Sequence, residues 1–517
     1  MFLNPIALII IVVVFLIAKL VQYNSYIRSY PPGPWALPVI GNFLQIDTAN
    51  PHRSMVKWSK KFGSVFTVWL PKPVVVLANI DAMKEALLQQ GDHFSDRPMS
   101  FLYNLFTAYN EDGDGIILCR GPRWQAQRRF ALRAFRTFGM GKQQMESRIG
   151  FHLDRLTEQI RRKILESSNE AAVVDLHYNL AFCFGNIIHD LVMGRHYEEG
   201  DPEFLHFKKM IDGVLQDVAS VQMLLIDNYP WFRYFLPTYS RYTRQGFALQ
   251  DFFIQEISRH EENFDPNREP DNFIDCYLRD MKSESAEKSD YLNRQTLVLN
   301  AGDLWTGGLE TVVTTVRWGI LYMIHHPDIQ TCCQRELDQV VGELPLTLAH
   351  RNRTPYLHAV LDELQRIVNV LPWNIPHCVN KDVVVCGHFI KDKFSNCPGT
   401  TVMPQLGAIN FDDRIFPNPE EFDPTRFLNP FSGDYVPSPF FLPFGMGRSE
   451  SKRACLGESL ARQELYLVFG TLLKDFVFEV DPTVGLPSLS RTAGMANVPK
   501  PTSYVVKRRS VETFEEN

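Results

Sequence analysis

The sequence contains no Cys-x-x-Cys pair, no internal repeat, no low-complexity tract and no long run of charges of one sign. Its nine cysteines are an odd number without paired spacing, which fits a reducing compartment better than a disulfide framework. A net charge of −6 gives no reason to expect nucleic acid as a partner. With 517 residues, 45% of them hydrophobic, the chain can bury a large core as one big domain or two.

A long hydrophobic stretch stands at the N-terminus, where residues 2–21 are apolar apart from Asn4 and Lys19. This length is at the short end for a membrane span, and a cleaved signal peptide is the alternative. No basic residue precedes the apolar run, no small-x-small cleavage site follows it, and Lys19 and Arg28 come only towards and beyond its end. The pattern predicts a retained transmembrane anchor over residues 1–22, with the bulk of the chain in the cytoplasm.

A proline-rich segment, Pro31-Pro32-Gly33-Pro34-Trp35, follows the apolar stretch. Prolines this dense favour a stiff extended segment, and an ordinary linker would have the same composition. Composition alone leaves open a proline-rich hinge or an ordinary linker over residues 23–35, followed by a large domain over residues 36–517.

A glycine-broken loop that carries several cations, residues 443–454, leads into Cys455, and a strongly helical segment follows at 459–474. Flanking cations and the start of a helix both favour a thiolate, so we expect the Cys455 thiol to ionise. A buried thiolate in such a loop could lie against a flat cofactor and donate to its metal. The alternative is a plain buried cysteine before an amphipathic helix.

Trp124 and Arg128 are four residues apart and would share one face of a helix. An indole N–H beside a guanidinium suits a carboxylate, which Arg can bind through two hydrogen bonds. The alternative is an amphipathic helix with a core tryptophan and a solvated arginine.

A long apolar helix is predicted over residues 291–324, and it contains Thr306-Gly307-Gly308-Leu309-Glu310-Thr311. Two glycines cost helix stability, and Thr311 can bond back to the carbonyl of residue 307, which loosens the helix. A groove opened by glycine, with an acid and a hydroxyl beside it, is a place to bind dioxygen and relay protons. The alternative is a close helix-packing point with a polar residue facing water.

Glu363 and Arg366 are three residues apart on another predicted helix, a spacing that usually gives an exposed ion pair worth little. A further arginine, Arg426, stands in the later segment Phe-Asp-Pro-Thr-Arg-Phe of residues 422–427.

Taken in order, these motifs resemble those of the cytochrome P450 superfamily, the haem-thiolate monooxygenases, and their details look like the family-2-type microsomal enzymes of animals. The resemblance spans essentially the whole chain and is carried in the cysteine loop by Phe444, Gly447, Cys455 and Gly457 and by the segment 458–462. It implies a mainly α fold with a small β-rich part, an N-terminal transmembrane anchor, and a haem-binding catalytic domain over 36–517.

The resemblance implies that one atom of dioxygen is inserted into a small apolar organic substrate such as a fatty acid, a steroid or a xenobiotic. The implied cofactor is haem b, and the implied electron source is NADPH through a membrane-bound reductase, with cytochrome b5 as a further candidate partner. The implied location is the endoplasmic reticulum membrane, with the catalytic domain facing the cytoplasm.

Matching the motifs assigns expected roles to residues of this chain. Taken alone, Arg97 would be an ordinary surface cation and His377 an ordinary structural histidine. The expected roles are: Cys455, metal ligand; Thr311 and Glu310, oxygen protonation; Trp124, Arg128, Arg97, His377 and Arg453, haem propionates; Phe444 and Gly457, cofactor-binding loop; Glu363, Arg366 and Arg426, a buried structural triad.

Two segments depart from the family pattern. Gly447 lies eight residues before Cys455 where the family has four, so residues 449–452 are extra, and residues 391–398 replace a connection of about two residues. Extra residues before Cys455 could bulge outward or displace Phe444. The second hypothesis is therefore a membrane-anchored haem-fold protein without monooxygenase turnover.

Overall fold

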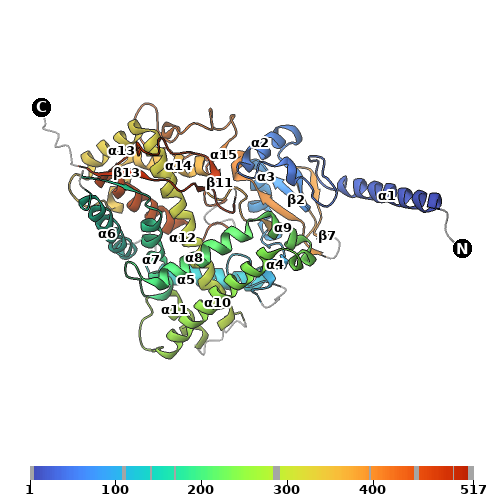
Figure 1. Cartoon of the computed structure of the whole chain (residues 1–517), viewed down its shortest axis with the longest axis horizontal. Coiled ribbons are helices and arrows are strands. Elements are labelled where there is room, and N and C mark those ends of the chain that lie inside the picture. Colours follow the sequence, from blue (N-terminus) through green and yellow to red (C-terminus); the bar gives the residue numbers. More distant parts are fainter. Residues whose placement is uncertain are drawn as a thin grey trace.

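The computed structural model describes residues 5–107, 112–139, 143–167, 170–282, 291–394, 397–446, 453–492 and 494–509, except for the side chains of 5–8 and 393–398. The chain is mostly helical with small sheets, which confirms the predicted fold class (Figure 1). The α-helices are α1 (Pro5–Ile27), α2 (Pro51–Phe62), α3 (Ile80–Lys84), α4 (Phe101–Asn104), α5 (Gly121–Thr137), α6 (Gln143–Leu165), α7 (His177–Met193), α8 (Pro202–Val218), α9 (Val221–Asn228), α10 (Pro237–Glu262), α11 (Phe273–Lys282), α12 (Arg294–His325), α13 (Pro327–Val340), α14 (Pro355–Val368), α15 (Leu406–Asn410), α16 (Glu458–Glu464) and α17 (Gly470–Asp475).

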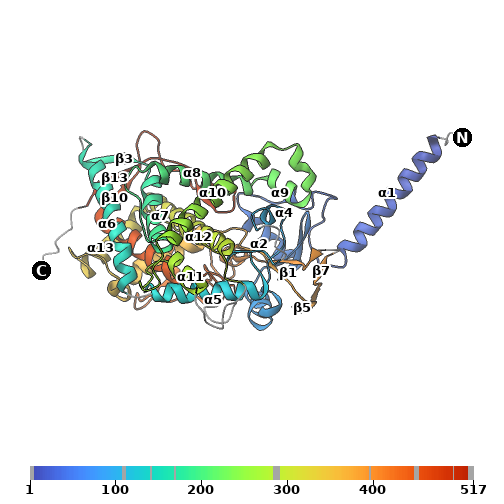
Figure 2. The ribbon, with the colours of Figure 1, turned by 90° about the horizontal axis from the view of Figure 1, so that it is seen from below.

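Helix α12 is the long helix predicted around the Gly-Gly motif, and it runs through the middle of the protein. Its first turn is capped by Asn293, whose side chain accepts a hydrogen bond from the Thr296 N–H. Its second half is buried almost all round, against α7 and α14 among others. Figure 2 shows α8, α9 and α10 along one side of the molecule and α5 along the other, with α12 between them.

The β-rich part is divided into small sheets. In the largest sheet, with strand order β1-β2-β9-β4, β1 and β2 pair antiparallel with Val65 opposite Leu77, and β2 pairs parallel with β9. A second sheet has the order β10-β13-β3. The strands are β1 (Val65–Leu70), β2 (Lys72–Leu77), β3 (Ala171–Val174), β4 (His377–Cys378), β5 (Val383–Val385), β6 (His388–Ile390), β7 (Lys393–Phe394), β8 (Cys397–Pro398), β9 (Thr401–Pro404), β10 (Phe476–Glu479), β11 (Arg491–Thr492), β12 (Val498–Pro499) and β13 (Tyr504–Arg508).

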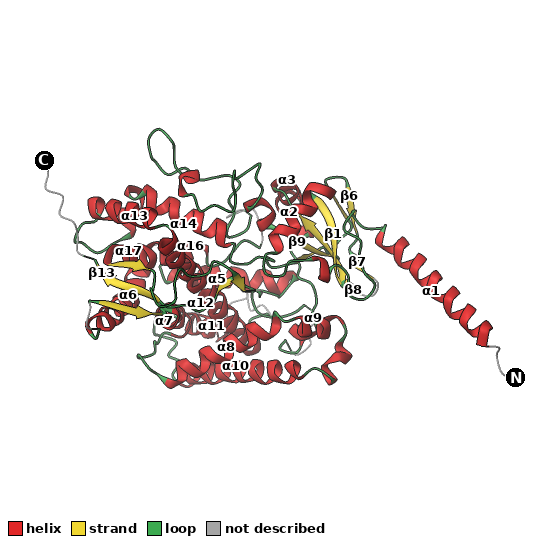
Figure 3. Ribbon diagram, turned by 45° about the horizontal axis from the view of Figure 1, so that its top comes forward, coloured by secondary structure: helices red, strands yellow, loops and turns green. Residues whose placement is uncertain are grey.

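Helix α1 projects away from the rest of the protein (Figure 3), and its segment Ile9–Ile27 is long and apolar enough to cross a membrane. The helix runs five residues past the predicted end of the anchor at residue 22, so the start of the predicted hinge is helical. Tyr23, Tyr26 and Tyr30 surround the buried ring of Trp69 on β1, with ring centroids 6.3, 5.3 and 5.5 Å away. These contacts hold the base of the helix against the first sheet, where the sequence alone suggested only a linker.

The described residues of the segment 391–398 add a pair of strands of their own. Strands β7 and β8 pair antiparallel, Lys393 opposite Pro398, as a separate two-stranded sheet. Strand β9 follows directly and still pairs with both β2 and β4. The largest sheet therefore accommodates the additional length without losing its pairing.

Candidate functional site

The cysteine loop is closed at its base by a backbone hydrogen bond. The N–H of Cys455 donates to the carbonyl of Phe444 at 2.9 Å, and the Phe444 ring lies 4.8 Å from the guanidinium carbon of Arg462 on α16. Residues 447–452, which include the extra segment 449–452, lie outside the described residues. Because the two ends of the loop are in direct contact, the extra residues do not separate Phe444 from Cys455.

The Cys455 side chain lies at the start of α16, with Gly457 at the N-cap position; part of its surface is open to solvent, although many protein atoms lie around it. Burial by the protein packed around it raises the pKa of the thiol, while the N–H groups of Gly457 and Glu458 and the charge of Arg128 lower it. The sequence led us to expect an ionised thiol, but in the protein alone burial outweighs the helix terminus and the cations. A metal cation bound to the sulfur would reverse that balance, since a coordinating thiol loses its proton.

Three arginines from separate segments, Arg97, Arg128 and Arg453, lie close to one another, and two of them contact Trp124. The Arg453 guanidinium stacks 3.7 Å from the Trp124 ring centroid, and Arg128 lies 5.8 Å from it. Arg128 Nη2 donates to the carbonyl of Ala454 at 2.6 Å, which ties α5 to the cysteine loop. Arg453 donates to the carbonyls of Ser95 and Cys119.

Arg97 is buried, at 5% exposure, so it is not the surface cation that its sequence context alone suggested. Its Nε donates to the Ile117 carbonyl at 3.1 Å, and its Nη1 donates to the carbonyls of Ile375 and Pro376 at 3.1 and 2.7 Å. Burial and the nearby Arg128 lower the pKa of Arg97 to about 9, and burial and Arg97 lower the pKa of Arg453 to about 8.

This cluster has the chemistry of an anion site that fits the haem. Burial disfavours all three charges, and repulsion from the neighbouring arginines adds to this for Arg97 and Arg453. Within the described ranges neither Arg97 nor Arg128 forms an ion pair with a carboxylate. Two carboxylates placed here would relieve that cost, because guanidinium groups bind carboxylates through two hydrogen bonds. The two propionates of a haem whose iron faced Cys455 would supply those carboxylates.

His377 on β4 fits the predicted propionate contact less well. Its Nδ1 lies 2.7 Å from the carbonyl oxygen of Phe94, which can only accept, so Nδ1 carries the hydrogen. The Nε2 of the neutral ring can then only accept a hydrogen bond. Because a carboxylate oxygen also only accepts, the two cannot bond to each other. Burial and Arg97 hold the pKa of His377 well below its usual range, so in this surrounding the ring has no N–H left for a propionate.

The two glycines of α12 differ in their surroundings. A Cβ on Gly308 would come within 2.9 Å of the Ile188 side chain on α7, whereas a Cβ on Gly307 would meet nothing within 4 Å. The hydroxyl of Thr311 donates to the Gly307 carbonyl at 3.0 Å, the back-bond expected from the sequence. Gly308 thus serves close packing, and Gly307 leaves open space beside a hydroxyl.

Glu310 forms an ion pair that the sequence did not indicate. Its Oε1 lies 2.9 Å from Nζ of Lys208 on α8, and the two side chains are 15% and 10% exposed. Lys208 also pairs with Asp212 on its own helix. Glu310 is therefore held between α12 and α8, with its charge balanced by a buried cation.

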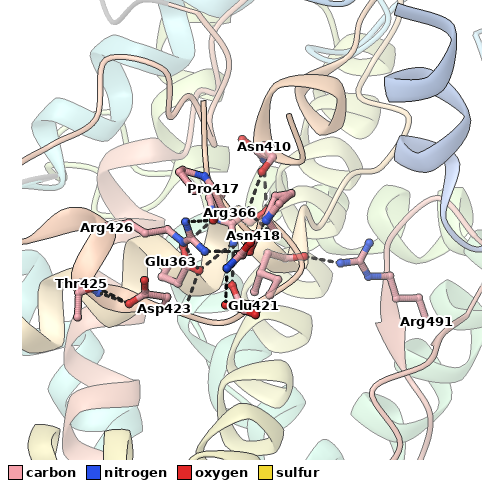
Figure 4. A network of polar contacts seen from close by, with 12 residues as sticks. Glu363, Arg366, Asn410, Pro417, Asn418, Glu421, Asp423, Thr425, Arg426 and Arg491 are labelled. Atoms are coloured by element: carbon pink, nitrogen blue, oxygen red, sulfur yellow. Dashed lines mark hydrogen bonds and ion pairs between the residues drawn. The ribbon is translucent and has the colours of Figure 1, made fainter. Parts of the chain in front are cut away.

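The structure brings Glu363, Arg366 and Arg426 together (Figure 4). Arg366 binds the Glu363 carboxylate twice, at 2.6 and 2.8 Å, and both side chains are fully buried. The Nε of Arg426 lies 3.4 Å from the same carboxylate. Arg366 also donates to three backbone carbonyls, those of Asn410, Pro419 and Glu421.

The fold is mainly helical, Cys455 lies at the start of α16 beside an anion site, and open space lies beside Gly307 on α12. Together these features define a haem-protein class. Residues 31–506 match the family described as Cytochrome P450, and the chain belongs to that family. Relatives include "3-ketosteroid oxygenase" of Caenorhabditis elegans, 34% identical over 499 residues, which cover 96% of this chain and 83% of the relative. "Cytochrome P450 2C44" of Mus musculus is 34% identical over 477 residues (91% and 92%), and "Cytochrome P450 2B4" of Oryctolagus cuniculus is 35% identical over 482 residues (92% and 93%).

The predicted family and its family-2-type character are thereby confirmed, and the chain is an oxidoreductase of the monooxygenase type. Membership also implies haem as the cofactor of the protein.

Proposed function

We propose that this protein is a membrane-anchored haem-thiolate monooxygenase that inserts one atom of dioxygen into a small apolar organic substrate. The observation that carries the proposal is the closed base of the cysteine loop, with the Cys455 N–H bonded to the Phe444 carbonyl at 2.9 Å. This contact keeps the thiol at the N-terminus of α16, next to the arginine cluster, despite the extra residues. The same contact disfavours a displaced Phe444, which is one of the two grounds for the alternative of a haem-fold protein without turnover; the other is negative charge added by Glu450 to the face where a reductase would dock.

In this proposal Cys455 is the iron ligand, and Phe444 and Gly457 shape the loop that presents its sulfur. Haem b, when bound, supplies the activation of dioxygen, and the protein supplies orientation and electrostatics. Trp124, Arg97, Arg128 and Arg453 hold the propionates. The triad of Glu363, Arg366 and Arg426 stabilises the fold around α14.

Thr311 and Glu310 deliver protons to the oxygen side. The Thr311 hydroxyl donates to the Gly307 carbonyl, so its oxygen lone pairs remain able to accept a hydrogen bond from a neighbour. Glu310, one residue earlier, forms an ion pair with Lys208 at 2.9 Å. We assign Glu310 the role of moving protons from the side of α8 towards the Thr311 hydroxyl.

The substrate is proposed to be a steroid, a fatty acid or a xenobiotic, and a steroid is the first to test because one relative is named a 3-ketosteroid oxygenase. Electrons come from NADPH through a membrane-bound reductase, with cytochrome b5 as a second donor.

We propose the endoplasmic reticulum membrane as the location of the protein, with α1 as its anchor and the catalytic domain in the cytoplasm. Exposed aromatic side chains at Trp231, Tyr234 and Phe235 support a contact with lipid close to the anchor, because the preceding Tyr229 hydroxyl bonds the Val39 carbonyl at 3.1 Å.

The test is turnover by the full chain in lipid nanodiscs with an NADPH-dependent reductase and testosterone, a 3-ketosteroid, as the first probe. The proposal expects hydroxylated product that depends on NADPH and disappears in Cys455→Ser. A matched variant lacking residues 449–452 separates the two hypotheses: product from this variant alone would favour the protein without turnover as the function of the natural chain.

A further inference from the structure

A chain of polar contacts connects the Cys455 loop to α14. On the loop side, the guanidinium carbon of Arg462 lies over the Phe444 ring, 4.8 Å from its centroid, and the Phe444 carbonyl accepts the Cys455 N–H. On the other side, Arg462 Nη1 lies 3.7 Å from Oδ1 of Asp362 on α14. Asp362 directly precedes Glu363 of the buried triad, so α14 presents neighbouring carboxylates to different arginines.

Asp362 is a buried carboxylate whose two oxygens are both engaged. Its side chain is 3% exposed, its Oδ1 faces Arg462, and its Oδ2 accepts a hydrogen bond from the Tyr435 hydroxyl. Burial raises the pKa of Asp362, whereas the Tyr435 bond and the charges of Arg462 and Arg351 oppose that rise. A hydroxyl donor and two nearby cations compensate a buried negative charge for the water that it has lost.

The Tyr435 side chain that binds Asp362 is held in place by a second ring. It stacks on His358, with ring centroids 3.7 Å apart and an angle of 12° between the planes. Nε2 of His358 accepts a hydrogen bond from Arg351 Nη2 at 3.0 Å, so the hydrogen of the neutral ring is on Nδ1. Burial and the charges of Arg351 and Arg462 lower the pKa of His358 to about 4, so the ring is uncharged at neutral pH. The hydroxyl is therefore presented to Asp362 by a stacked ring of fixed orientation.

Arg462 has a further acid partner on its own helix. Its Nε lies 2.9 Å from Oε1 of Glu458, one turn earlier on α16, and both side chains are 18% exposed. A partly exposed ion pair within one helix contributes little. Because Glu458 moves with α16, this pair cannot fix Arg462 relative to the rest of the protein. Asp362 comes from another helix and is buried, so it is the acid that can do so.

We propose that Asp362 is a positioning residue of the Cys455 loop: it holds the Arg462 cation against the face of Phe444 and so sets the charge and the packing beside the sulfur. The negative face of an aromatic ring attracts a cation, so ring and guanidinium restrain each other. Contacts around a ligand of a haem iron tune its reduction potential. The effect on a haem rests on the proposed function, in which Cys455 ligates the iron, whereas the effect on the loop does not.

The test compares Asp362→Asn and Arg462→Met with two exposed controls, Asp328→Asn on α13 and Arg414→Met. In the haem-loaded full chain, a spectroelectrochemical titration should give a higher reduction potential for Asp362→Asn, which loses a negative charge. It should give a lower potential for Arg462→Met, which loses a positive charge, and neither control should shift. Hydrogen exchange of the Cys455 amide should rise about tenfold in both variants, because the contact that restrains Phe444 is lost.

Opposite shifts distinguish this role from a merely structural one, because a loosened fold would move the potential in the same direction in both variants. Potentials that shift together, or not at all, in folded variants would overturn the proposal. Tyr435→Phe keeps every charge and removes only the hydroxyl that binds Asp362, so it should also speed exchange of the Cys455 amide, even if Asp362→Asn folds poorly. Unchanged exchange in Tyr435→Phe would count against the proposal in the same way.

The exchange result does not depend on which atom ligates the iron. A natural chain whose carbon-monoxide spectrum lacks the thiolate band would refute the proposed function, and amide exchange would still decide the role of Asp362 in the loop.

Discussion

Replacing Arg366 by Met is the most direct perturbation of the buried triad. The change removes two charge-assisted hydrogen bonds to Glu363, at 2.6 and 2.8 Å, and leaves a fully buried carboxylate with the more distant Arg426. Breaking a buried ion pair by removing one partner costs about 3–5 kcal/mol. Three backbone carbonyls lose a donor as well, so we expect the loss to lie in the upper part of that range.

The loss should depend on pH in a defined direction. Burial raises the pKa of Glu363, and Arg366 is among the groups that oppose this effect. Without Arg366 the folded-state pKa rises further above that of the unfolded chain. For an acid with a raised pKa, the stability present below the unfolded value is lost as the pH rises through the folded value, so Arg366→Met should be more destabilising at pH 8 than at pH 5.

Guanidinium chloride unfolding, followed by circular dichroism and by haem absorbance, measures this loss. Arg414→Met is the matched control, because Arg414 also pairs closely with an acid, Asp412, but is 68% exposed and should cost at most about 1 kcal/mol. A Glu363→Met, Arg366→Met double variant should recover part of the stability, since no unpaired charge remains. If Arg366→Met unfolds within about 1 kcal/mol of the Arg414→Met control, the account of the triad is refuted.

Three further predictions concern the Thr311 hydroxyl, the Asp303 carboxylate on α12 and the contact between α1 and Trp69. Asp303 accepts hydrogen bonds from the N–H groups of Ile116 and Ile117, at 2.7 and 2.9 Å. Thr311→Val should lower the fraction of NADPH-derived electrons that appear in product about a hundredfold, the low end of the range for loss of a proton-transfer group, while Thr311→Ser should stay close to the natural protein. Equal coupling in both variants would contradict the role of the hydroxyl. Burial, with the charge of Asp114 as a further contribution, raises the pKa of Asp303 to about 6, although the two backbone N–H groups oppose the shift. Relative to Asp303→Asn, the natural protein should therefore lose stability as the pH rises from about 4 to 7, measured by unfolding at each pH, and a flat difference would disprove the raised pKa. Trp69→Ala should release the tyrosines of α1 and speed trypsin cleavage after the exposed Arg28 in nanodiscs about tenfold, with Trp35→Ala unchanged as the control for an exposed aromatic; equal rates would show that the joint is loose.

Contacts within one helix turn were the part of the site that the sequence could predict. The Thr311 bond to the Gly307 carbonyl and the Glu363–Arg366 pair follow from spacings of four and three residues. The pair was expected to be exposed on spacing alone, because the burial of α14 depends on segments distant in the sequence. The triad was placed correctly only because a family resemblance supplied Arg426.

The sequence could not predict ion pairs between residues distant in the chain or the direction of a pKa shift that depends on tertiary packing. Lys208 lies 102 residues before Glu310, and no local pattern connects them. The direction of the Cys455 pKa shift was wrong because desolvation by tertiary packing has no sequence signature. Of the two alternatives for the Gly-Gly motif, close helix packing applies to Gly308, and dioxygen binding beside Gly307 stays a prediction.

The central claim is that Cys455 binds the haem iron in the natural chain, with its extra residues in place. The absorption spectrum of the reduced, carbon-monoxide-bound protein, expressed without the anchor, tests it directly. The account predicts a Soret band at the long-wavelength position of thiolate-ligated haem, lost in Cys455→Ser and present without deletion of residues 449–452. A band at the position of haem with a neutral ligand, or no haem, would contradict it.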